Sequence, residues 1–91
     1  AEVGRGGHIL ARVDDTIRQR IEQPKDGAYT NYLVDSGIDK ILKKLGEEST
    51  EVVIAAKNDS ALELRAEAAD LLFHLLVLLR VRNLPVDEVW K

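Results

Sequence analysis

The sequence contains no cysteine and no methionine, and aromatic residues make up only 4% of it. Without cysteine the chain forms no disulfide and no thiolate metal site, and its redox compartment is not indicated. So few aromatic rings leave little material for the stacking platforms that bind single-stranded nucleic acids. The formal net charge of -3 also disfavours nonspecific binding to nucleic acid. We therefore expect no nucleic-acid partner.

The sequence also lacks a long apolar run. Its most apolar stretch, residues 71–79, is interrupted by His74 and is much shorter than the roughly 20 residues that a membrane span needs. No signal peptide is visible. We therefore expect no membrane partner and predict a cytoplasmic protein.

The length of 91 residues allows one domain at most. A chain this short buries only about 60–65% of its unfolded surface. Because the resulting core is small, such chains are commonly stabilised by oligomerisation. Hydrophobic residues at 45% and charged residues at 32% are ordinary for a soluble globular protein. We set residues 1–7 aside as a flexible N-terminal lead and assign residues 8–91 to the single domain.

Apolar residues at steps of three and four predict a first amphipathic helix over residues 8–23, which Pro24 ends. Residues 24–37 form a linker, punctuated by two glycines. Within it, residues 28–33 are expected to form a short helical turn. Two tyrosines lie in this segment, and they either pack the linker over the helices or contact a substrate.

A second helix is predicted to begin near Ser36 or Gly37, because Ser36 followed by Asp39 resembles a capping box. Asn58 is a suitable C-terminal stop for it. Ser60 followed by Glu63 is a cleaner capping box and begins the third helix. A short fourth helix follows at the C-terminus, with Pro85 in its first turn.

The third helix is apolar almost all round, and a helix of that kind is buried on every side. A monomer with three long helices can hardly bury it, so a partner chain is implied. We therefore predict an all-α fold: an antiparallel helical bundle of three long helices and a short C-terminal one, completed by homodimerisation.

Two acidic pairs with helical spacing are the most informative feature. Glu48 and Glu51 are three residues apart, as are Glu67 and Asp70, and residues three apart share a helix face. Glu47 adjoins the first pair. If the second and third helices pack antiparallel, these acids converge, and carboxylates at close range repel one another unless a cation intervenes. Oxygen-only ligands favour Mg²⁺, with Mn²⁺ as the alternative.

Each acidic group taken alone has a plainer interpretation. Glu47 and Glu48 beside lysines could be surface charge, and Glu67 and Asp70 could form ion pairs with an arginine of their own helix. The combination favours a metal, because both pairs lie on adjacent helices and one helix is otherwise apolar. Buried carboxylates without partners cost several kcal/mol each.

The flanking residues indicate the chemistry. His74 lies one turn beyond Asp70, and we expect it to hydrogen-bond to a carboxylate of the site rather than to bind the metal. Lysines at 40, 43 and 44 precede the acids, and cations beside an oxygen-ligand metal site suggest a phosphorylated substrate. The predicted reaction is metal-assisted hydrolysis at phosphorus, with a carboxylate orienting the attacking water.

The acidic pattern resembles the signature of the all-α nucleoside triphosphate pyrophosphohydrolase superfamily. More specifically, the runs at residues 27–30, 40–56 and 67–79 resemble phosphoribosyl-ATP pyrophosphohydrolase of histidine biosynthesis, a resemblance that covers residues 9–91. It implies an all-helical homodimer that uses Mg²⁺. The implied reaction is hydrolysis of the α–β phosphoanhydride of phosphoribosyl-ATP, a small-molecule nucleotide, to phosphoribosyl-AMP and pyrophosphate.

The resemblance also implies roles for single residues. The metal ligands are Glu48, Glu51, Glu67 and Asp70. Glu47, with Glu48 and Glu51, belongs to the catalytic set, and Glu47 activates water or holds a second metal. The residues that bind substrate phosphates are Lys40, Lys43 and Lys44. The substrate loop contains Tyr29 and Thr30. Phe73 departs from the tyrosine expected in many relatives, and the C-terminus is short.

Two other functions remain open on the sequence. One is a house-cleaning pyrophosphohydrolase that acts on another, noncanonical nucleoside triphosphate. The other is a non-catalytic helical dimerisation module whose acids form only salt bridges. Release of pyrophosphate from phosphoribosyl-ATP in the presence of Mg²⁺ distinguishes both of these functions from the hydrolase that the family resemblance implies.

Overall fold

The computed structural model describes residues 3–90, and side chains from residue 9 onward. Within residues 3–90 there is no strand, which confirms the all-α class. The elements in chain order are α1 (Val3–Glu22), α2 (Tyr29–Ser36), α3 (Ile38–Lys57), α4 (Ala61–Val81) and the 3₁₀ helix η1 (Val86–Trp90).

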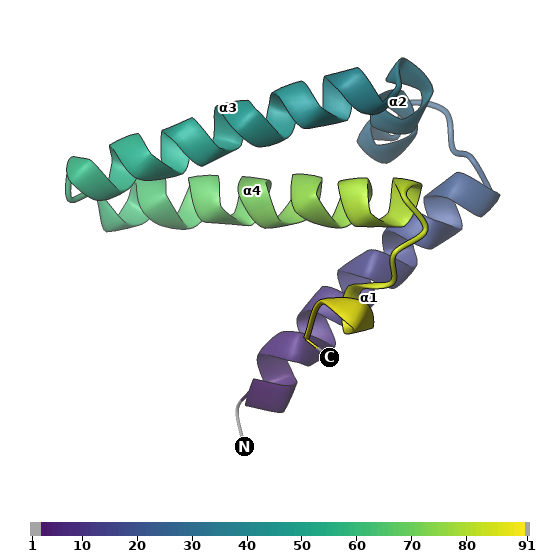
Figure 1. Ribbon diagram of the computed structural model, residues 1–91, viewed down its shortest axis with the longest axis horizontal. Helices are drawn as coiled ribbons and strands as arrows, with labels where there is room; N and C mark the ends of the chain where they lie inside the picture. Colours follow the sequence, from purple (N-terminus) through teal and green to yellow (C-terminus); the bar gives the residue numbers. More distant parts are fainter. Residues whose placement is uncertain (1–2, 91) are drawn as a thin grey trace.

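Helices α3 and α4 form an antiparallel hairpin and lie side by side along their length (Figure 1). Helix α1 runs obliquely away from the open end of this hairpin, with η1 against it, and the short α2 packs where α1, α3 and α4 meet (Figure 1). The predicted antiparallel arrangement therefore holds for the hairpin, whereas α1 does not run alongside it.

The turn between α3 and α4 follows the sequence signals. Asn58 ends α3, as predicted, and Asp59 takes the left-handed conformation with φ of 57°. Ser60 caps α4, because its hydroxyl accepts a hydrogen bond from the Glu63 backbone N–H at 3.2 Å. This tight turn forces the two long helices to run back along each other.

Two helix starts differ from the prediction. Helix α1 begins at Val3, five residues before the expected start, so only residues 1 and 2 of the expected lead lie outside the described residues. The predicted helical turn in the linker is the eight-residue helix α2, which begins where Gly27, with φ of 81°, and the extended Ala28 redirect the chain.

The predicted capping box at Ser36 is wrong. The Ser36 hydroxyl donates to the Tyr32 carbonyl, so Ser36 belongs to the last turn of α2. Gly37 instead precedes α3, with φ of 96° and no side-chain cap. A serine satisfied inside one helix is not available to cap the next one.

The core is small and draws on all five elements, as a chain of this length requires. The cluster of buried apolar side chains consists of Ile17, Leu33, Ile41, Leu76, Val77 and Val86. A partly buried ion pair connects α4 to α1, in which Arg80 donates through both Nε and a terminal nitrogen to the carboxylate of the buried Asp14.

Helix α4 is not covered on every side by the rest of the chain. Leu72 and Leu75 are 46% and 37% exposed on it, and Leu62 is 69% exposed near its start. The homodimer expected to cover this helix stays a prediction. Among the described residues, no helix has the length and apolar character to cross a membrane. The predicted fourth helix is the single 3₁₀ element η1, and Lys91 lies outside the described residues.

Candidate metal centre and nucleotide site

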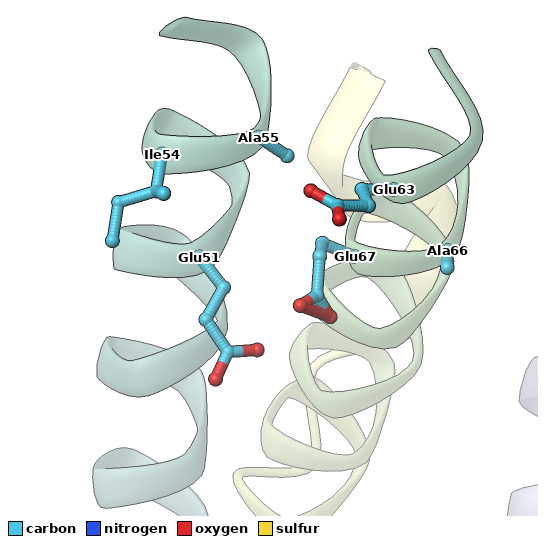
Figure 2. Close-up of a pocket in the computed structure, with 6 residues that line it drawn as sticks. All are labelled: Glu51, Ile54, Ala55, Glu63, Ala66 and Glu67. Carbon is cyan, nitrogen blue, oxygen red and sulfur yellow. The ribbon is translucent and has the colours of Figure 1, made fainter. Parts of the chain in front are cut away.

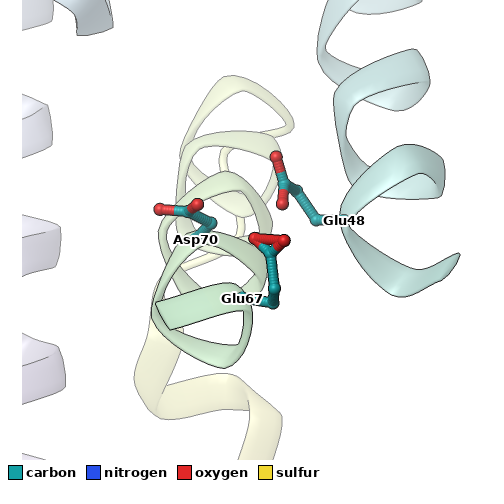
Figure 3. Close-up of side chains that lie close together, drawn as sticks. All are labelled: Glu48, Glu67 and Asp70. Carbon is teal, nitrogen blue, oxygen red and sulfur yellow. The ribbon is translucent and has the colours of Figure 1, made fainter. Parts of the chain in front are cut away.

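The hairpin brings together the acids that the sequence placed on two helices. Glu48 projects from α3 and meets Glu67 and Asp70 of α4 (Figure 3). One carboxylate oxygen from each lies within 4.8 Å of the other two. Convergence follows from the antiparallel packing, since residues early in α4 stand opposite residues late in α3.

Glu51 lies one turn further along α3 and interacts with Glu67 across the gap (Figure 2). A hydrogen bond with Glu51 is the main reason that the pKa of Glu67 rises to about 7, with desolvation and neighbouring negative charges adding to it. Three of the four predicted metal ligands, Glu48, Glu67 and Asp70, therefore converge, and Glu51 borders them.

Glu48 occupies the most confined position of the four. Its Oε2 atom is buried and has no hydrogen-bond partner. Burial, then a hydrogen bond with Glu51 and the charges of Glu51 and Asp70, raises the pKa of Glu48. An orphaned carboxylate oxygen among other carboxylates is what a divalent cation compensates, and an all-oxygen set suits Mg²⁺ or Mn²⁺. The residues present therefore fit the expected ion.

The basic residues lie toward the start of α3. Lys44 Nζ is 3.8 Å from Glu47 Oε1, and Lys40 Nζ lies over the Tyr32 ring, 5.7 Å from its centroid. Glu47 is exposed and is not one of the converging carboxylates. Lys43 is exposed as well. Of the three lysines, Lys44 therefore contacts an acid of the motif, Lys40 contacts Tyr32, and Lys43 shares neither contact.

The hydrogen bond predicted between His74 and a carboxylate is not formed. His74 is buried, at 5% exposed, and its Nδ1 lies 2.8 Å from the backbone oxygen of Asp70. Its Nε2 lies 2.9 Å from the hydroxyl of Tyr29. A carbonyl oxygen only accepts, so Nδ1 carries the hydrogen and Nε2 of the neutral ring accepts from Tyr29. The sequence could not reveal this, because it gives no ring orientation.

The two residues predicted for the substrate loop have different environments. Tyr29 is 44% exposed, and its ring lies between those of Tyr32 and Phe73, with centroids 6.0 and 6.1 Å away. Thr30 is only 9% exposed on the inner side of α2. Of this pair, only Tyr29 presents a substantial surface to a substrate in the described chain.

A pocket of about 320 Å³ opens between α3 and α4 beyond the acid cluster, toward the turn of the hairpin (Figure 2). Its lining residues are Glu51, Ile54, Ala55, Glu63, Ala66 and Glu67. The sequence predicts Glu63 as part of the Ser60 cap and places it on one stripe of the helix with Glu67, Asp70 and His74, but does not assign it to the site. Its spacing of four residues from Glu67 puts both on one face.

Comparison with known proteins gives a family match. Residues 10–91 match the family described as phosphoribosyl-ATP pyrophosphohydrolase. The chain is 65% identical over 81 residues to the phosphoribosyl-ATP pyrophosphatase of Listeria monocytogenes serotype 4a, an alignment that covers 89% of this chain and 78% of that protein.

Two longer relatives are similar over the same length. The histidine biosynthesis bifunctional protein HisIE of Halalkalibacterium halodurans is 62% identical over 81 residues, and that of Bacillus subtilis is 56% identical over 81 residues. Each alignment covers 89% of this chain but only 38% and 39%, respectively, of the bifunctional proteins. The chain thus spans well under half the length of these two relatives.

Proposed function

Because the chain belongs to the phosphoribosyl-ATP pyrophosphohydrolase family, we propose that it hydrolyses the α–β phosphoanhydride of phosphoribosyl-ATP. The products are phosphoribosyl-AMP and pyrophosphate, and the step belongs to histidine biosynthesis. Relatives that the chain matches over most of its length are named phosphoribosyl-ATP pyrophosphatases, so the chain is a hydrolase of a pyrophosphate bond.

The observation that carries this proposal is the convergence of Glu48, Glu67 and Asp70 around one point, with a buried oxygen of Glu48 left without a partner. These three residues would hold Mg²⁺, with Mn²⁺ as a substitute. When bound, the ion would neutralise phosphate charge and polarise the scissile linkage. A salt-bridged dimerisation module explains the geometry less well, since no cationic side chain pairs with these acids among the described ion pairs.

We assign Glu51 the task of orienting and deprotonating the attacking water. It borders the cluster without being one of its three converging residues, whereas Glu47 pairs with Lys44. In the reaction, the water oxygen forms a bond to one phosphorus of the α–β linkage while the bond from that phosphorus to the bridging oxygen breaks. The water proton passes to the carboxylate, and Lys40 and Lys44 balance the phosphate charge.

The proposal is tested by measuring pyrophosphate release from phosphoribosyl-ATP and from a panel of canonical and noncanonical nucleoside triphosphates, with Mg²⁺ and with EDTA. We expect phosphoribosyl-ATP to be cleaved with a kcat/KM at least about a hundredfold above the panel, and cleavage to stop with EDTA. Preference for a noncanonical triphosphate would make the chain a house-cleaning enzyme. No cleavage of any substrate would leave the dimerisation module.

We further propose that the chain acts as a homodimer. The support is that Leu72 and Leu75, two apolar side chains of α4, are exposed to solvent. Exposed apolar patches commonly mark interaction surfaces. A molar mass measured by light scattering tests this directly. The cytoplasmic location remains a prediction from the sequence.

A further inference from the structure

The three converging acids differ in how firmly the surrounding chain holds them. Glu48 and Glu67 are half-buried, whereas Asp70 is exposed. An aspartate carboxylate is also closer to the main chain than a glutamate carboxylate and has one rotatable bond fewer, so its oxygens follow the main chain more closely. The geometry of Asp70 therefore depends most on the helix turn that carries it.

That turn of α4 has a hydrogen bond beyond the ordinary helical pattern. In an α-helix the carbonyl of residue 70 accepts from the backbone N–H of residue 74. The same carbonyl oxygen of Asp70 also lies 2.8 Å from Nδ1 of His74, which carries the ring hydrogen. A carbonyl oxygen has two lone pairs and accepts both bonds. The imidazole ring therefore fixes the main chain at Asp70.

The His74 ring is itself held in one orientation. The residue is buried, and the rings of Tyr29 and Phe73 meet it edge-on, with interplanar angles of 88° and 81°. At the other nitrogen, the Tyr29 hydroxyl donates to Nε2 across 2.9 Å. Without that donor the buried acceptor would be unsatisfied, and a ring that turned to find another partner would withdraw Nδ1 from Asp70.

Tyr29 is a donor at a fixed place because α2 is anchored on its other sides. Leu33 is fully buried in the core cluster. Asn31 donates through Nδ2 to the Arg20 carbonyl at 2.7 Å, and its Oδ1 accepts from the Lys25 backbone N–H at 2.9 Å. These contacts hold α2 against the end of α1, so the Tyr29 hydroxyl connects a fixed element to the His74 ring.

We propose that Tyr29 and His74 are positioning residues of the metal centre, which together hold the main chain of Asp70, and hence its carboxylate, in place for a divalent cation. This inference rests on the metal centre of the function proposed above. Both ring nitrogens of His74 are engaged, so the histidine acts through Asp70 and not as a ligand. The role also differs from the substrate contact that the family resemblance implies for Tyr29.

The test measures the Mn²⁺ affinity of the full chain by electron paramagnetic resonance, without substrate. The variants are Tyr29→Phe, which removes only the hydroxyl, His74→Leu, which removes both ring nitrogens, and the double variant. The matched control is Asp14→Ala, which destabilises the fold by breaking the ion pair with Arg80. Arg80 is ten residues beyond Asp70, about 15 Å along α4. Circular dichroism at the temperature of the measurement confirms that each variant is folded.

We expect Tyr29→Phe and His74→Leu each to weaken Mn²⁺ binding about tenfold, as changes behind a metal ligand commonly do. Because the two residues form one connection, the double variant should be about as weak as the weaker single variant rather than about a hundredfold weaker than the unaltered chain. Asp14→Ala should stay within about twofold, since it lowers stability without touching the connection. If His74→Leu does not fold, the comparison of Tyr29→Phe with Asp14→Ala still decides.

Mn²⁺ affinity that stays within about twofold in Tyr29→Phe and His74→Leu would overturn the inference. Fully additive losses in the double variant would overturn it as well, because the two residues would then act independently. An equal loss in Asp14→Ala would reduce the effect to general destabilisation and would also contradict it. Failure of the proposed function gives a different result, because the unaltered chain would then bind no Mn²⁺, and the positioning roles would be withdrawn with the metal centre.

Discussion

The hydroxyl of Tyr29 lies 2.9 Å from Nε2 of His74, and the same imidazole ring lies 2.8 Å, through Nδ1, from the carbonyl oxygen of Asp70. Two hydrogen bonds thus connect the first residue of α2 to the turn of α4 that carries one of the converging acids. The Tyr29 hydroxyl is engaged in this connection and thereby links α2 to the turn of α4 beside the acid cluster.

Replacing Tyr29 with Phe should destabilise the fold. The substitution removes only the hydroxyl and leaves Nε2 of a buried histidine without its donor, at a cost of about 1–3 kcal/mol. The melting temperature should fall by about 4–8 °C for each 1 kcal/mol lost. Urea unfolding of both proteins measures the loss.

The matched control for this change is Tyr32→Phe. Tyr32 belongs to the same aromatic stack but is 51% exposed, and its hydroxyl interacts with Lys40 and Ser36 rather than with His74. It should lose no more than about 0.5 kcal/mol. Equal losses in the two variants would mean that the Tyr29–His74 bond contributes nothing of its own.

The protein without metal should lose stability as the pH rises from about 4.5 to about 7. The pKa of Glu67 is raised from its ordinary value of 4.5 to about 7, first by its hydrogen bond with Glu51. The folded state therefore holds a proton that the unfolded state has released, so stability decreases with pH in this window. Added Mg²⁺ should oppose the decrease at neutral pH, because a ligand of the folded state alone stabilises it.

Thermal melts between pH 4.5 and pH 8, with EDTA or with Mg²⁺, measure this dependence. Glu67→Gln is the control, because an amide at this position does not titrate and the slope should flatten. A metal-free protein that becomes more stable over this range would contradict the arrangement of Glu51 and Glu67 described here.

The ion pair between Asp14 and Arg80 should behave as a buried one. Asp14 has a side chain only 7% exposed, and that of Arg80 is 21% exposed. Asp14→Ala leaves the guanidinium nearly buried without its partner, which should cost about 3 kcal/mol. The double variant Asp14→Leu with Arg80→Met removes both charges and should cost clearly less than Asp14→Ala alone. A double variant as unstable as the sum of the single variants Asp14→Leu and Arg80→Met would show that the two residues do not interact.

The sequence predicts a structural feature correctly where that feature depends on interactions between residues close in sequence. The Ser60–Glu63 cap and the stop at Asn58 are local signals, and both predictions are confirmed. The convergence of Glu48 with Glu67 and Asp70 was also accessible, because helical spacing and a tight turn together determine it.

The errors arose where a side chain had two possible partners or where tertiary packing decided the outcome. Ser36 satisfies its hydroxyl on Tyr32 inside α2, so it does not cap α3. Nothing local distinguishes Tyr29, which faces out, from Thr30, which faces in, because that depends on which face of α2 meets the other helices. The oblique direction of α1 likewise depends on packing and on the Asp14–Arg80 pair, whose members are far apart in sequence.

Because Glu51 is proposed as the general base and Glu48 as a metal ligand, Glu51→Gln and Glu48→Gln should have different effects. Glu51→Gln should lower kcat at least about a hundredfold, the usual contribution of a general base, while Mn²⁺ affinity, followed by electron paramagnetic resonance, stays within about threefold. Glu48→Gln should weaken Mn²⁺ about tenfold or more, because it alters a residue at the centre of the cluster.

Glu22→Gln on α1 is the matched control, since Glu22 is an exposed acid paired with Arg18 and lies outside the cluster. It should change neither kcat nor Mn²⁺ affinity. Loss of Mn²⁺ affinity in Glu51→Gln would instead make Glu51 a metal ligand, as the family resemblance first implied. Near-normal turnover in that variant would remove Glu51 from the reaction and return the assignment to Glu47, the remaining acid of the motif. The first outcome is a change in Mn²⁺ affinity and the second is a lack of change in turnover, so both measurements on the same variants distinguish them.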